Sequence, residues 1–102
     1  MNIYKKYTNS DKSTVEIERI YRKKFDELCT SLQFRQTSGS QDGYKTEMRE
    51  LNDECAVLER IVYENQFANN EIEKWVFDAK MKWIEEHKQQ REVLIATCTM
   101  NI

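Results

Sequence analysis

The chain has 102 residues, a net charge of −2, two glycines and no proline, and 33% of its residues are charged. This length allows one small domain. Such sparse turn chemistry excludes a sheet protein, which needs a turn about every ten residues. We therefore predict an all-α protein, and an apolar fraction of 39% predicts a thin core that favours self-association.

The segment at residues 1–12 lacks the apolar core of a signal peptide, and no apolar run in the chain reaches membrane-spanning length. The three cysteines, Cys29, Cys55 and Cys98, are too widely spaced for a redox pair, and a single histidine, His87, argues against structural zinc. We expect a reduced, cytoplasmic protein that has no membrane contact, metal or cofactor.

The first elements in chain order are an arm and a helix. Residues 1–12 are predicted to form a flexible N-terminal arm. Ser13, followed three residues later by glutamate, has the form of a capping box and begins a predicted helix over 13–34. Glu18 and Arg22 are ordered for an ion pair one turn apart. The apolar residues of this helix share one face and are Ile17, Tyr21, Phe25, Leu28 and Leu32.

Residues 35–43 contain both glycines together with serine, threonine and aspartate, and they are the predicted connection to the next helix. Asp42 is a suitable N-cap for that helix. Between residues 44 and 97 there is neither glycine nor proline, so we predict a long helix over 44–97 and a frayed tail at 98–102. A short connection usually makes two such helices antiparallel neighbours, which gives a helical hairpin.

The long helix carries a heptad pattern, in which seam positions alternate at spacings of four and three residues. These positions are Tyr44, Met48, Leu51, Cys55, Leu58, Val62, Asn65, Asn69, Ile72, Val76, Ala79 and Trp83. A turn usually disturbs this register and here the register does not slip, so we favour one continuous helix with at most a kink near Asn69. Asn70 followed by Glu73 resembles an N-cap pair and supports the alternative, a break at 68–70 that gives a compact three-helix bundle.

An unbroken helix of about 54 residues would be about 80 Å long, whereas the helix over 13–34 would cover only about 30 Å of it. The remainder would expose more apolar surface than a monomer tolerates. We therefore expect a coiled-coil-like homodimer or higher oligomer. The predicted oligomer seam consists of Leu51, Leu58, Val62, Asn65, Asn69, Ile72 and Val76.

The second half of the long helix also contains residue types that are enriched in interface hot spots. Phe77 and Ile84 lie beside the seam and give the helix a second apolar face. The predicted partner-binding residues are Trp75, Phe77, Met81, Trp83 and Ile84. The favoured interpretation is that they fill the protein's own core or its dimer seam, because Val76, Ala79 and Trp83 continue the same seam.

Basic residues interleaved with tyrosines in the first part of the chain suggest an anionic ligand, because such surfaces contact phosphates and stack on bases. The candidate residues are Tyr7, Arg19, Arg22, Lys23 and Lys24. Interspersed acidic residues and a sequence pI of 5.5 make an ion-paired, solvated face the favoured interpretation. Nucleotide or nucleic-acid binding is therefore the second choice.

The sequence contains no glycine-rich phosphate loop, nucleophile elbow or metalloprotease motif. His87 does not share a helical face with Glu85 or Glu86, so no acid–base pair is indicated. We predict a small non-enzymatic helical protein that acts by stoichiometric protein–protein binding, as an inhibitor, adaptor or assembly factor, with itself and another protein as partners. The alternative is a helical oligomer that binds an anionic ligand through its basic first helix.

Overall fold

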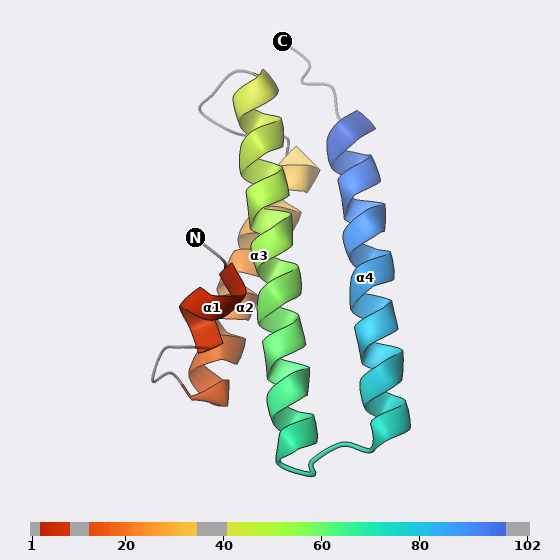
Figure 1. The fold of residues 1–102 in the computed structure, drawn as a ribbon. Coiled ribbons are helices and arrows are strands. Elements are labelled where there is room, and N and C mark those ends of the chain that lie inside the picture. The colour runs from red at the N-terminus through yellow and green to blue at the C-terminus, as the bar shows by residue number, and fades with distance from the viewer. Residues whose placement is uncertain (1–2, 9–12, 35–40, 98–102) are drawn as a thin grey trace.

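The computed structural model describes residues 3–8, 13–34 and 41–97, and no strand occurs in these ranges. Four helices are packed against each other (Figure 1), and the all-α prediction is confirmed. Their bounds are α1 Ile3–Thr8, α2 Thr14–Phe34, α3 Gln41–Ala68 and α4 Lys74–Thr97. The expected tail at 98–102, with Cys98, and most of the expected connection at 35–43 lie outside the described residues.

Helix α2 matches its prediction at both ends. Ser13 precedes the helix, and its Oγ accepts a hydrogen bond from the backbone N–H of Glu16 at 3.2 Å, as an N-cap should. Arg22 pairs with Glu18 at 2.8 Å. The predicted apolar face is the packed face, since Ile17 and Leu28 are buried there. Helix α3 begins at Gln41, so Asp42 lies in its first turn and not at the predicted N-cap position.

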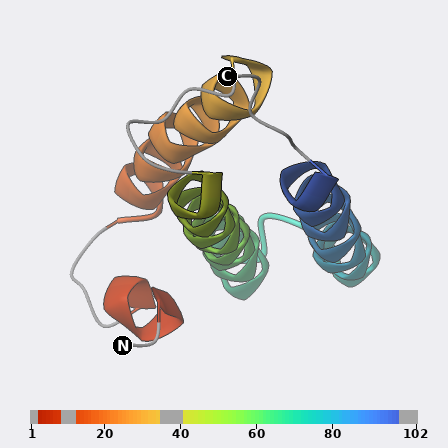
Figure 2. The same cartoon turned by 90° about the horizontal axis from the view of Figure 1, so that it is seen from above.

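Helix α3 is the centre of the molecule, with α2 and α4 on different sides of it (Figure 2). Because α3 is buried on two faces, its buried residues include positions outside the predicted heptad seam. The buried residues of α3 are Met48, Asn52, Cys55, Ala56, Leu58, Glu59, Ile61 and Val62. A helix enclosed in this way needs apolar residues over more than one stripe, as the sequence of α3 provides.

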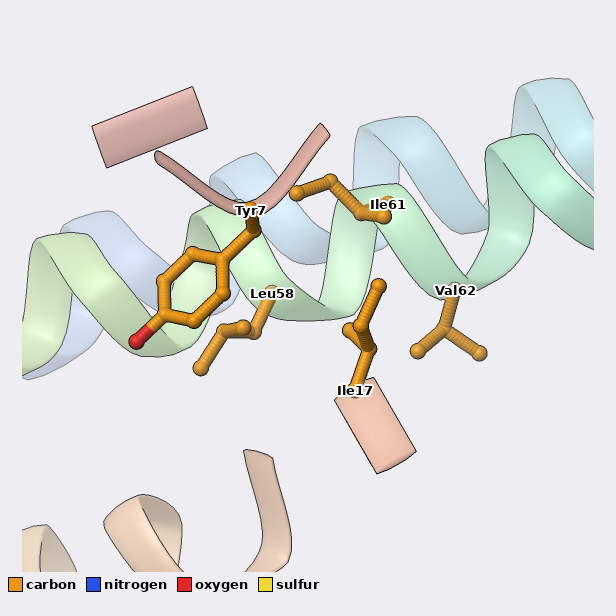
Figure 3. Close-up of a cluster of buried hydrophobic side chains, with 5 residues drawn as sticks. All are labelled: Tyr7, Ile17, Leu58, Ile61 and Val62. Atoms are coloured by element: carbon orange, nitrogen blue, oxygen red, sulfur yellow. The ribbon is translucent and has the colours of Figure 1, made fainter. Parts of the chain in front are cut away.

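The core has two parts along α3. The first lies where α2, α3 and α4 meet and consists of Leu28, Met48, Cys55 and Ile95. The second lies where α1, α2 and α3 meet and consists of Tyr7, Ile17, Leu58, Ile61 and Val62 (Figure 3). All these side chains are at most 7% exposed, so each removes most of its apolar surface from water.

The favoured prediction of one continuous helix over 44–97 is wrong, because the backbone leaves the helix after Ala68. Asn70 has a φ of 58°, and its N–H donates to the carbonyl of Phe67 at 3.1 Å. The N–H of Glu71 donates to the carbonyl of Gln66 at 2.8 Å. These two bonds form a Schellman motif, which requires one residue in the left-handed conformation. Asparagine adopts this conformation more readily than most other residues do. Asn70 therefore ends α3 and does not cap α4.

The turn sends α4 back along α3, antiparallel to it (Figure 1). At the far end, Lys45 Nζ donates to the carbonyl of Ala96 at 3.2 Å, which joins the start of α3 to the end of α4. The longest dimension of the molecule is 50 Å, well short of the length expected for an unbroken arm. The alternative prediction, a break at 68–70 that gives a compact three-helix bundle, describes the path of α2, α3 and α4 better. Helix α1 is an additional helix.

The predicted flexible arm at residues 1–12 is corrected in part, because Ile3–Thr8 form α1 and pack on α3. Tyr7 is 5% exposed, and its hydroxyl donates to Glu54 Oε1 at 2.5 Å. Burial of an aromatic ring together with a satisfied hydroxyl holds this short helix in place. In the described part of the chain, the helices are all too short or too polar to cross a bilayer.

Candidate functional site

Helix α4 carries two heptad series on different sides. The inward stripe consists of Phe77, Met81, Ile84, Lys88, Arg91 and Ile95, all of which are buried or half-buried. The outward stripe consists of Val76, Ala79, Trp83, Glu86, Gln90 and Val93, all exposed apart from the half-buried Val76. At 100° per residue, the two stripes are about 150° apart around the helix. Helix α4 therefore packs with one face and presents a second one to solvent.

The inward stripe is held by a polar cluster as well as by apolar contacts. Asn52 of α3 is fully buried; its Nδ2 donates to the carbonyl of Lys88 at 3.1 Å, and its Oδ1 accepts from Arg91 Nε at 2.6 Å. The Arg91 guanidinium lies 5.6 Å from the centre of the Phe25 ring. Lys88 Nζ is 3.3 Å from Asp53. Because one amide side chain satisfies two groups of α4, the cluster fixes where α4 docks along α3.

A buried carboxylate belongs to the same region. Glu59 is 6% exposed, and this burial raises its pKa above the ordinary value. The charge of Arg91, a hydrogen bond from Tyr21 and the more distant charges of His87 and Lys80 act in the opposite direction. Burial also raises the pKa of Tyr21, so its hydroxyl remains a proton donor to Glu59. These contacts join α2, α3 and α4.

The exposed aromatic side chains of α4 lie on its outward side, where Trp83 belongs to the outward stripe and Trp75 lies beside it. Trp75 is 69% exposed and Trp83 is 41% exposed, and they are the two tryptophans of the chain. Trp75 Nε1 donates to Glu73 Oε2 at 2.5 Å. The Trp83 and His87 rings are tilted by 38° with centroids 4.1 Å apart, and Lys80 Nζ lies 5.6 Å from the centre of the Trp83 ring. Both indoles are thus held by residues of their own segment while much of their surface remains in water.

The structure divides the predicted partner-binding residues between the two faces. Trp75 and Trp83 lie outward, as binding residues should. Phe77, Met81 and Ile84 lie on the inward stripe, so the prediction of an exposed apolar face at Phe77 and Ile84 is wrong. Ile84 is 5% exposed, and Phe77 stacks on Phe67 of α3 at 4.6 Å, beside the turn. Within α4, the predicted seam positions Val76, Ala79 and Trp83 lie on the outward stripe, and the neighbouring series packs on α3.

The predicted oligomer seam is largely used within the chain. Leu58 and Val62 are buried, and the half-buried Leu51 packs against the core cluster of α2, α3 and α4. Asn65 Nδ2 donates to Thr14 Oγ1 of α2 at 3.2 Å. The remaining members lie at the turn or beyond it: Asn69 is exposed, and Ile72 and Val76 are half-buried. Leu51, Leu58 and Val62 are therefore not available as a surface for a second copy.

The predicted anion-binding residues do not converge on one site. Tyr7 is buried and donates to Glu54, so its ring is not available to stack on a base. Lys24 pairs with the same carboxylate at 3.1 Å. Burial alone would raise the pKa of Glu54, but the hydrogen bonds from Tyr7 and Lys24 lower it overall. Arg22 is engaged with Glu18, and Arg19 and Lys23 are exposed on α2.

Sequence reasoning missed Asn52, Glu59 and Arg91, which are the polar residues of the buried cluster. Asn52 directly follows a seam leucine, and Arg91 lies beyond Trp83, the last of the predicted seam positions. One signal was present: the residues from Phe77 to Ile95 keep the same alternating spacing as the other series. A second series on one helix predicts contacts on two sides.

Metal ligands and thiols are the remaining reactive groups to place. No group of three or more histidine, cysteine, aspartate or glutamate side chains in the described ranges is placed to hold a metal ion. Burial raises the pKa of the Cys55 thiol to about 12, so this cysteine is a poor nucleophile. No family model matches the chain, and no curated protein or solved structure matches it either.

Proposed function

We propose that this protein is a non-enzymatic, stoichiometric binder of other proteins, acting as an inhibitor, adaptor or assembly factor through the outward stripe of α4. The observation that carries the proposal is the placement of both tryptophans on that side, exposed and yet held by Glu73 and by His87. Tryptophan is a preferred hot-spot residue, and a ring that already contacts a neighbouring side chain has less entropy to lose when a partner covers it.

The shape of the surface indicates the kind of partner. Apolar residues recur on the outward stripe at heptad spacing, and Ala79 leaves space between Trp75 and Trp83 for a side chain from the partner. An amphipathic helix that lays its apolar face along α4 fits this pattern. The inward stripe, fixed by Asn52 and Arg91, keeps α4 on α3 while the other side binds.

Photo-crosslinking in the cells that make the protein tests this function. A crosslinking amino acid at position 79 should trap a partner at a defined stoichiometry, whereas the same probe at the exposed Glu85, on the other flank of α4, should not. For the trapped protein, Trp75→Ala or Trp83→Ala should lower the affinity roughly tenfold or more, while circular dichroism remains unchanged. Equal trapping at both positions, or an affinity that is insensitive to both tryptophans, would refute the proposal.

A further inference from the structure

The outward stripe is symmetric in spacing about its midpoint, and both of its end residues are valines. Its six residues form three pairs from the ends inwards. These are Val76 with Val93, Ala79 with Gln90, and Trp83 with Glu86 in the middle. Each pair is centred on the same point, between Ile84 and Glu85. Two antiparallel copies of α4 related by a two-fold axis at this point would oppose the members of each pair, as the layers of an antiparallel coiled coil require.

The charges beside the stripe favour this same arrangement. Lys82 lies before the centre and Glu86 after it, so antiparallel pairing places Lys82 of each copy near Glu86 of the other. Parallel pairing would instead oppose the two Glu86 side chains, which repel. Within one copy, Lys82 and Glu86 form an ion pair at 3.9 Å with side chains 81% and 56% exposed, and so exposed a pair is weak enough to exchange for one across the interface.

The surface is large enough to contribute substantially to a dimer. A tryptophan side chain offers roughly 150–250 Å² of contact surface, so with 69% and 41% exposed, the tryptophans of two copies provide on the order of 500 Å². The valines and the charged flanks add to this, towards the roughly 1,200–2,000 Å² of a standard specific interface. We expect a reversible dimer, because the interface area would be near the lower limit of this range and polar residues would lie at its centre.

We propose that the occupant of the outward stripe is a second copy of this chain, packed antiparallel about a two-fold axis between Ile84 and Glu85. The proposal rests on the proposed function, that this face binds protein helices, and it names the helix that fits. The two α4 helices lie at the centre of the assembly, and each inward stripe stays on its own α3. The pairing of Trp83 with Glu86 of the other copy gives the indole N–H an acceptor.

Sedimentation and tryptophan emission over one dilution series test the assembly. The mass should fall from dimer to monomer on dilution, and the emission should shift to the red in parallel, because both tryptophans of the chain lie at the interface. Trp83→Ala should weaken association roughly tenfold or more. A monomer at every concentration overturns the proposal, as does a dimer whose dissociation leaves the emission unchanged.

Engineered cysteines test the orientation in a Cys29→Ser, Cys98→Ser background. Chains carrying Ala79→Cys should form disulfides with chains carrying Gln90→Cys, and neither variant should link to itself. Self-linking of Ala79→Cys would show parallel pairing and overturn the inferred geometry. A monomeric chain whose position 79 still traps another protein would overturn the self-pairing alone, whereas a monomer that traps nothing there would overturn the proposed function as well.

Discussion

Replacing Asn52 by alanine tests the buried polar cluster that docks α4. The substitution removes the acceptor of Arg91 Nε and the donor to the Lys88 carbonyl, and it leaves both groups in a site where Asn52 itself is 0% exposed. A hydrogen bond to a charged group contributes about 1.5–3 kcal/mol, and one between neutral groups contributes about 1 kcal/mol. We expect Asn52→Ala to lower the free energy of unfolding by about 3 kcal/mol.

The assay is urea unfolding followed by circular dichroism, with thermal unfolding as a second measurement. A loss of about 3 kcal/mol corresponds to a fall in Tm of roughly 12–24 °C in a domain of this size. The matched control is Asn65→Ala, because Asn65 is half-buried and makes one side-chain bond, to Thr14, at 3.2 Å. That control should cost about 1 kcal/mol or less.

A double-mutant cycle separates the Arg91 bond from general packing. Arg91→Met keeps an apolar side chain against Phe25 but cannot donate to Asn52. Combined with Asn52→Ala, it should show a coupling energy of about 1.5–3 kcal/mol. A coupling energy near zero, or a loss below about 1 kcal/mol for Asn52→Ala alone, would refute the view that this cluster fixes α4.

Two further predictions concern the turn and the buried carboxylate. Because Asn70 has a φ of 58°, Asn70→Ala should lower the free energy of unfolding by about 1–2 kcal/mol, whereas Asn70→Gly should leave it nearly unchanged. Thermal unfolding measures both, and equal effects would contradict the left-handed turn. Burial raises the pKa of Glu59 above its ordinary 4.5, so the folded chain holds this proton more tightly than the unfolded chain does. The folded state therefore loses stability as the pH rises through the raised pKa. Glu59→Gln should therefore be more stable than the parent at neutral pH, and the gain should disappear below pH 4.5 in urea titrations. A variant that is less stable at neutral pH would show that the charge of Arg91 outweighs the burial.

Helix α2 could be predicted closely because each of its determinants is local. Ser13 caps it, Glu18 pairs with Arg22, and the residues from Ile17 to Leu32 share one face. The α3–α4 turn could not be predicted from register, because residues 69–73 lie between the two helices and the heptad count continues through them unchanged. The N-cap form of Asn70 and Glu73 indicated a break at 68–70, and Asn70 instead takes the left-handed conformation that ends α3.

The candidate site was predicted in part for a related reason. Helix α4 is apolar on two sides, and periodicity does not reveal which side meets α3. The choice depends on Asn52 and Arg91, which are 39 positions apart and whose pairing no local pattern encodes. Trp75 and Trp83 are exposed, and their role in binding stays a prediction; the outward orientation of their side of α4 follows from that distant contact.

The order of helices around α3 has a consequence for folding kinetics. Helices α2 and α4 each pack against the helix adjacent to them in sequence, and such low-contact-order topologies fold in microseconds to milliseconds. Helix α1 differs, because its Tyr7–Glu54 bond closes a loop spanning 47 positions and its six residues are too few to form a stable helix alone. We expect α1 to dock after the other three helices, so the rate-limiting barrier should be insensitive to Tyr7→Phe, while the unfolding rate should rise.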